Sequence, residues 1–102
     1  MDLACLDAFI EQQLSSRISI HQLAQLSHLS PSHFQRVFRE NLNTSPHQYV
    51  LQKRLSKAQR LLQDSSITLC QIAELCGFSS QAAMSNSFRK CLNVTPGQLR
   101  RQ

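Results

Sequence analysis

Apolar residues recur at intervals of three and four along most of the chain, which is the period of an amphipathic α-helix. No segment shows the alternation of apolar and polar residues that predicts a half-buried strand. The periodicity and the helix-capping residues together predict an all-α fold. Seven helices are expected, over residues 3–14, 20–26, 31–41, 46–62, 69–76, 80–91 and 96–101.

The chain contains two copies of one helical unit. Residues 18–30 align with residues 67–79 at an offset of 49, and after one inserted residue the offset becomes 50. The identical pairs include apolar, small and capping residues: Ile18/Ile67, Gln22/Gln71, Ala24/Ala73, Leu26/Leu75, Ser30/Ser79, Phe38/Phe88, Arg39/Arg89, Leu42/Leu92, Asn43/Asn93, Pro46/Pro96 and Gln48/Gln98.

Each copy carries its own helix start and stop signals. Four capping boxes of the pattern Ser/Thr-x-x-Gln are expected at Ser19–Gln22, Ser45–Gln48, Thr68–Gln71 and Thr95–Gln98. Pro46 and Pro96 follow two of these caps at the first helical position, where a missing N–H costs nothing. Asn43 and Asn93 are expected to end helices, because Asn tolerates the left-handed conformation of a C-cap.

A short capped helix, a tight turn and a second helix form the helix-turn-helix pattern, which appears once in each copy. Ala24 and Ala73 stand where the two helices approach closely, and Leu29 and Phe78 are expected to anchor the turns in the core. The predicted organisation is one domain over residues 1–102, comprising a first helix-turn-helix subdomain over 3–45, a linker helix over 46–62 and a second subdomain over 63–102.

The charge of the chain favours a polyanionic partner. The 102 residues carry a formal charge of +5, and all 11 Lys and Arg residues follow the acidic stretch 1–16. A basic helical domain most often binds nucleic acid, although a merely solvated basic surface is the alternative. No apolar run is long enough for a membrane span and no signal peptide is present, so we expect a cytoplasmic protein with no membrane partner.

The four cysteines do not have the spacing of a metal site. Cys5, Cys70, Cys76 and Cys91 include no C-x-x-C pair, and each has apolar neighbours in the sequence. We therefore expect them to pack in the core, with redox sensing or metal binding as alternatives. There is also no carboxylate pair, Cys/His constellation or Gly-rich phosphate loop, so no enzyme activity, cofactor or metal is predicted.

The second helix of each motif has a polar outward face. The apolar positions Phe34, Val37, Phe38 and Leu42 are expected to point inward in the first, and Met84, Phe88 and either Cys91 or Leu92 in the second. The outward or flanking positions are Ser32, His33, Gln35, Arg36, Arg39 and Glu40 in the first, and Gln81, Ala82, Ser85, Asn86, Arg89 and Lys90 in the second. Gln and Arg can pair with base edges, while an ordinary solvated helix face is the alternative.

A long motif runs through the second copy as Ile72-Ala73, Gly77-Phe78-Ser79-Ser80-Gln81, Phe88-Arg89-Lys90 and Val94-Thr95-Pro96. A second motif in the linker helix consists of Arg54, Ala58, Leu61 and Leu62. With these residues the chain resembles, over nearly its whole length, the DNA-binding domain of the AraC/XylS family of bacterial transcription regulators. The resemblance implies two helix-turn-helix motifs joined by a long helix.

The resemblance also implies roles for individual residues. The base-reading positions would be Ser32, Gln35 and Arg36 in the first recognition helix, and Gln81, Ala82, Ala83 and Asn86 in the second. Phosphate contacts would come from Arg39, Lys53, Arg54, Arg89 and Lys90. For Arg54 a packed stem with an internal hydrogen bond is an equal alternative.

The sequence departs from the family pattern at several positions. Ala83 and Asn86 replace a bulky residue and an Arg, so the second recognition helix is expected to discriminate less than the first. Asn43 and Asn93 replace the usual Gly, and His28 stands where Gly77 stands in the second copy. No ligand role is predicted for His28.

The expected function is that of a sequence-specific DNA-binding transcription regulator, and by resemblance an activator. The two recognition helices would lie about 34 Å apart, one turn of DNA, and enter two successive major-groove segments. The alternative is a protein-interaction module in which residues 3–14 or the linker helix dock another domain or RNA polymerase. Most relatives carry a separate ligand-binding and dimerisation domain, so we expect an excised C-terminal domain rather than a standalone regulator.

Overall fold

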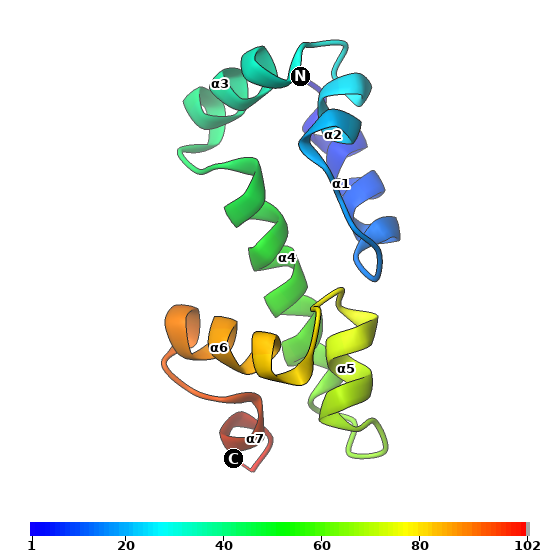
Figure 1. Ribbon diagram of the computed structural model, residues 1–102, viewed down its shortest axis with the longest axis vertical. Helices are drawn as coiled ribbons and strands as arrows, with labels where there is room; N and C mark the ends of the chain where they lie inside the picture. The colour runs from blue at the N-terminus through cyan, green and yellow to red at the C-terminus, as the bar shows by residue number, and fades with distance from the viewer. Residues whose placement is uncertain (102) are drawn as a thin grey trace. The chain divides into compact units, whose positions relative to one another are not determined.

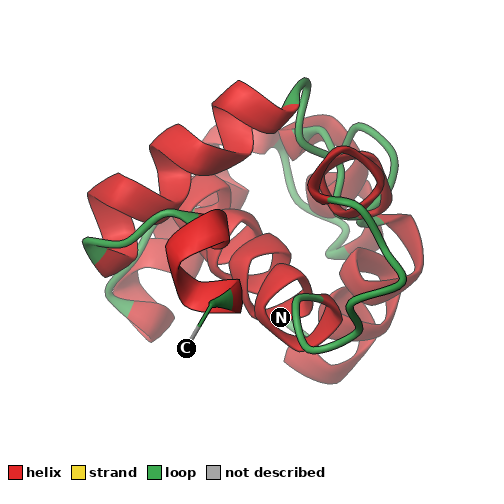
Figure 2. Ribbon diagram, turned by 90° about the horizontal axis from the view of Figure 1, so that it is seen from below, coloured by secondary structure: helices red, strands yellow, loops and turns green. Residues whose placement is uncertain are grey.

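The computed structural model describes residues 1–101, and within this range every regular element is a helix (Figure 1, Figure 2). The elements are α1 (Leu3–Gln13), α2 (Ile20–Leu26), α3 (Pro31–Leu42), α4 (Pro46–Leu61), α5 (Leu69–Leu75), α6 (Gln81–Leu92) and α7 (Pro96–Arg100). The predicted all-α fold of seven helices is therefore confirmed for the described residues, with ends that differ from the prediction by no more than one residue.

The chain forms two compact units that divide within α4, after Lys53. The first unit contains α1, α2, α3 and the start of α4, and the second contains the rest of α4 with α5, α6 and α7. The long helix thus contributes packing surface to each unit, which is why apolar residues continue along its whole length.

The core of the first unit forms from the inward stripes of its helices. Its buried members are Leu6, Ile10, Leu14, Leu23, Ala24, Phe34, Phe38 and Val50. The Phe38 ring lies 5.6 Å from the Phe34 ring and 5.3 Å from the Tyr49 ring, centroid to centroid, and the second contact is edge-on. Such aromatic contacts add to the stabilisation that burial provides, and they fix α3 against α4.

The second unit buries residues at the positions equivalent to those of the first. Ile72, Ala73, Met84 and Phe88 are each no more than 2% exposed, as are their repeat partners in the first unit. Leu55 and Ala58 of α4, with Leu62 directly after it, complete this core together with Cys76 and Pro96. The pattern that revealed the repeat is therefore largely a pattern of core positions.

Three of the four predicted capping boxes are complete, and the fourth, at Ser45, shows only the bond to its hydroxyl. Complete capping boxes occur at Ser19, Thr68 and Thr95, and at Ser45 the hydroxyl accepts the amide of Gln48 at 3.1 Å. Asn43 and Asn93 end α3 and α6 in the left-handed conformation, with φ of 55° and 60°. These local signals explain why the helix bounds follow so closely from the sequence.

The two helix-turn-helix turns share one backbone geometry. The amide of Leu29 donates to the carbonyl of Ala24 at 3.0 Å, and the amide of Phe78 donates to that of Ala73 at 2.9 Å. This Schellman bonding needs a left-handed residue one position earlier. That residue is Gly77, with φ of 81°, in one turn and His28, with φ of 57°, in the other.

The prediction that the cysteines pack in the core is wrong for three of the four. Cys76 is buried, but Cys5, Cys70 and Cys91 are exposed. Each exposed cysteine has an apolar neighbour in the sequence that is less exposed than the cysteine itself. Leu6 beside Cys5, for example, is 1% exposed. Adjacent residues on a helix face different directions, so apolar neighbours alone do not place a residue in the core.

Candidate nucleic-acid interface

The outward face of α3 carries the base-reading residues predicted for the first unit. Phe34 and Phe38 are buried, whereas Ser32, Gln35 and Arg36 are exposed. The helix begins at the Ser30 cap, whose hydroxyl accepts the amide of His33 at 3.3 Å. The buried aromatic rings fix the rotation of α3, so the three polar side chains share the solvent side of the helix.

The outward face of α6 has the same construction with different chemistry. Met84 and Phe88 are buried, while Gln81, Ala82 and Asn86 are exposed. Ala83 is half-buried, and its amide donates to the Ser80 cap at 3.0 Å. Of the four predicted readers on this helix, Ala83 thus presents the least surface to a ligand.

On α6, a residue predicted to read a base is hydrogen-bonded to a residue predicted to contact phosphate. A guanidinium nitrogen of Arg89, Nη2, donates a hydrogen bond to Oδ1 of Asn86, one turn earlier on the helix. Lys90 is exposed, as are Arg89 and its repeat equivalent on α3, Arg39. Arg39, Arg89 and Lys90 therefore lie at the surface of their helices, as a contact to phosphate requires.

Arg54 lies partly inside the second unit. Its Nη1 donates to the carbonyl oxygen of Cys76 at 2.8 Å, where that carbonyl ends α5. Burial lowers the pKa of Arg54 from its ordinary value, although nearby Cys76 opposes the shift. This geometry matches the packed-stem alternative for Arg54, and the phosphate role stays a prediction.

Lys53 is placed among acidic and aromatic groups of the first unit. Its Nζ lies 3.7 Å from Oδ1 of Asp7, 3.9 Å from Oε1 of Glu11 and 5.3 Å from the centroid of the Tyr49 ring. The Tyr49 hydroxyl donates to Oδ1 of Asp7 at 2.6 Å. Burial, with this hydrogen bond and the carboxylate charges, raises the pKa of Tyr49 to about 12. The acidic face of α1 is thus engaged within its own unit.

Two further cations donate hydrogen bonds to carbonyls at the ends of helices, a role that the sequence did not predict. Lys57 Nζ donates to the carbonyl of Leu75 at 3.0 Å, at the end of α5. Arg100 donates from Nε to the carbonyl of Leu62 at 3.2 Å and from Nη2 to that of Asp64 at 3.1 Å. Positive charge is favourable at helix C-termini because unsatisfied carbonyls gather there. These partners are 18 to 38 residues apart, so no local sequence signal could reveal them.

The charge is divided unequally between the units. Seven of the 11 Lys and Arg residues, but only two of the six acidic residues, lie from residue 54 onward, so this part carries the whole formal charge of +5. Residues 1–53 contain four basic and four acidic residues. They also contain all four histidines, and each of these is exposed.

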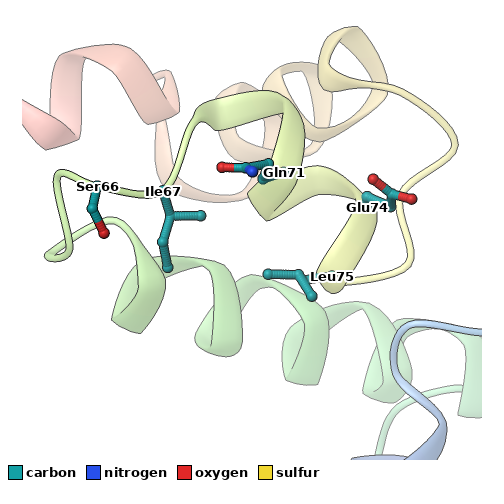
Figure 3. Close-up of a pocket in the computed structure, with 5 residues that line it drawn as sticks. All are labelled: Ser66, Ile67, Gln71, Glu74 and Leu75. Carbon is teal, nitrogen blue, oxygen red and sulfur yellow. The ribbon is translucent and has the colours of Figure 1, made fainter.

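A surface pocket of about 480 Å³ lies beside α5 and is lined by Ser66, Ile67, Gln71, Glu74 and Leu75 (Figure 3). Leu75 is 43% exposed there. No residue predicted to contact DNA lines this pocket, so it is separate from the exposed face of α6.

Residues 1–101 contain no cluster of three or more His, Cys, Asp or Glu side chains that could hold a metal ion. Over the same residues, every helix is too short or too polar to cross a membrane.

Comparison with known proteins shows where this fold recurs. A family model described as a helix-turn-helix domain matches residues 23–102. The chain is 38% identical over 96 residues to a probable transcriptional regulator, LumQ, of Photobacterium leiognathi. The aligned region covers 94% of this chain and 39% of LumQ. The chain thus spans about two fifths of that relative.

Two solved structures are similar to this chain over most of their length. The DNA-binding domain of the global transcriptional factor AdpA, crystallised with a target DNA, has 31% identity and a TM-score of 0.88, over 97% of this chain and 89% of that one. An AraC-type transcriptional regulator from Chromobacterium violaceum has 34% identity and a TM-score of 0.85, over 93% and 85%. The chain therefore belongs to the AraC-type family of helix-turn-helix DNA-binding domains found in transcriptional regulators, and not to an enzyme family.

Proposed function

We propose that this domain reads DNA sequence by placing α3 and α6 in two successive segments of the major groove, as part of a transcription regulator. The observation that carries the proposal is the repeated construction of the two helices. In each, buried residues at equivalent positions fix the rotation, and a row of polar or small residues faces solvent. An α-helix with such a face fits the major groove, where each base pair presents its own pattern of donors and acceptors.

The two helices are proposed to contribute unequally to base reading. On α3, Gln35 and Arg36 can each form bidentate bonds, and Ser32 adds a hydroxyl. On α6, Gln81 and Asn86 are the hydrogen-bonding readers, whereas Ala82 and Ala83 offer only methyl contacts. We expect most of the discrimination between bases to come from α3.

Phosphate contacts are proposed first for Arg39 and Lys90, whose side chains are exposed on the two recognition helices. Lys53 and Arg54 are less suited in this conformation, because Lys53 lies between two carboxylates and Arg54 holds the end of α5. Each could reach a phosphate only by giving up part of those contacts.

Arg36→Ala tests the reading role of α3. The substitution removes a guanidinium that has no hydrogen-bond or ion-pair partner among residues 1–101, so we expect folding to be unaffected. Affinity for the preferred site should fall by about 1–3 kcal/mol, with relaxed preference at one base pair. Selection of binding sites from random DNA, followed by titration of the selected site, measures both quantities. An unchanged preference profile would show that Arg36 does not read a base.

The family resemblance supports two finer proposals about the whole regulator. One is that it activates transcription, through contact with RNA polymerase in the cytoplasm. The other is that a ligand-binding and dimerisation domain accompanies this one, since the chain spans only 39% of LumQ. Transcription in vitro from a promoter that carries the selected site, with purified polymerase, tests the first proposal.

A further inference from the structure

The two recognition helices carry different pairs of residues at the same two positions of the repeat. Arg36 and Arg39 occupy these positions in α3, and Asn86 and Arg89 occupy them in α6. Two guanidinium groups have no acceptor to share, whereas an Asn side chain supplies one. This is the contact that forms in α6, where Arg89 Nη2 donates to Asn86 Oδ1.

The bond changes what Asn86 can offer to a base. An Asn side chain has one acceptor, Oδ1, and two donor hydrogens on Nδ2. Bidentate pairing with adenine uses both, because Oδ1 accepts from the N6 amino group while Nδ2 donates to N7. A bond from a charged guanidinium is stronger than a neutral one, so Oδ1 is held toward Arg89 and Nδ2 is turned away from it.

The surroundings on α6 favour this arrangement. The helix has no acidic residue, so no carboxylate on it competes for Arg89. One turn before Asn86, the exposed Ala82 presents only a methyl group. Lys90 follows Arg89, at the position where α3 has Glu40. Neither the Ala82 nor the Lys90 side chain therefore adds a hydrogen-bond acceptor beside Asn86.

We propose that Asn86 and Arg89 act as one donor-only unit that selects guanine, with Arg89 positioning the Asn86 amide. The major-groove edge of guanine offers two acceptors, N7 and O6, whereas adenine and cytosine each present an amino donor there. The inference rests on the proposed function, since it requires α6 to lie in the major groove. It assigns Arg89 a role in specificity in addition to the phosphate contact that the sequence predicts.

Selection from random DNA with the whole chain and a set of variants tests the inference. Asn86→Ala first identifies the base pair, as the position whose preference disappears. At that position the unmodified chain should prefer guanine. In Arg89→Ala the freed Oδ1 can accept from adenine, so the guanine-to-adenine ratio should fall about tenfold.

Lys90→Ala is the matched control, because it removes a neighbouring exposed cation from the same helix. It should weaken binding to all sequences and leave the guanine-to-adenine ratio unchanged. Arg89→Lys keeps a charged donor and should retain the guanine preference, which a variant with a damaged fold could not do.

Three outcomes would overturn the inference. If Arg89→Ala lowers affinity for all sequences as Lys90→Ala does, without changing the ratio, Arg89 is a phosphate contact only. If the unmodified chain prefers adenine at the Asn86 position, Oδ1 is not withheld from the base. If the unmodified chain selects a site but Asn86→Ala changes no position of it, α6 does not read through Asn86. Failure of the unmodified chain to select any sequence would instead refute the proposed function itself.

Discussion

At the scale of single residues, the repeat places different side chains in positions with the same backbone requirement. His28 and Gly77 both adopt the left-handed conformation that the turn bonding demands. A residue with a Cβ is disfavoured there, whereas Gly adopts this conformation without steric cost. The first turn therefore holds a strained residue that the second turn avoids.

His28→Gly should stabilise the first unit by about 0.5–1 kcal/mol, because the relief of strain exceeds the extra entropy that Gly loses on folding. Gly77→Ala should destabilise the second unit by about 1 kcal/mol for the opposite reason. Urea denaturation followed by far-UV circular dichroism measures both effects. Equal stabilities for His28→Gly and the unmodified chain would show that the His28 side chain compensates for its conformation.

At the scale of the helices, both ends of α5 are held by side chains, and at its C-terminal end those side chains are two cations of α4. Thr68 caps the start of the helix through a complete capping box. At the other end, Arg54 and Lys57 of α4 donate to the carbonyls of Cys76 and Leu75. The helix has only seven residues and would be marginal alone, so these contacts and its buried face hold it in place.

Arg54→Met should destabilise the second unit by about 1–2 kcal/mol, since it removes a charged hydrogen bond and keeps most of the apolar stem. Arg60→Met is the matched control from the exposed side of α4, and its effect should stay within about 0.5 kcal/mol. Urea denaturation gives both values. Unchanged stability in Arg54→Met, together with weaker binding to every DNA sequence, would assign Arg54 to phosphate instead.

At the scale of the whole molecule, several of the cations that make up the formal charge already have partners within the chain, so fewer are available to contact DNA phosphates. Lys53 lies between Asp7 and Glu11, and Arg54, Lys57 and Arg100 donate to main-chain carbonyls. The acidic α1, which the sequence suggested as a docking surface, uses two of its carboxylates within the first unit. The exposed cations of the recognition helices are the better candidates for salt-dependent binding.

The salt dependence of DNA binding should separate these two classes of cation. The affinity for DNA falls as salt concentration rises, so the slope of log affinity against log salt is negative. Lys90→Ala should make this slope less steep by about 0.9, the value for one lost phosphate contact. Lys53→Ala should leave the slope nearly unchanged, because the charge of Lys53 is already balanced. Titrations at several salt concentrations measure the slopes. Equal reductions in both variants would mean that Lys53 leaves Asp7 and Glu11 when DNA binds.

The sequence by itself determined the helices, their caps and the repeated unit, because those features depend on residues no more than a few positions apart. Ser19 and Gln22, or Asn43 at its helix end, act within one turn of backbone. The buried aromatic residues followed from helical periodicity for the same reason. The family pattern added which face of each recognition helix should meet DNA.

Only the tertiary structure decided how the polar and ionisable groups are used. Tyr49 and Asp7 are 42 residues apart, and Arg54 and Cys76 are 22 apart, so their hydrogen bonds depend on which helices pack together. The exposure of Cys5, Cys70 and Cys91 was also settled by packing, because it depends on the direction in which each helix turns its core face. The type of a residue determines its chemistry, but the fold determines which group it contacts.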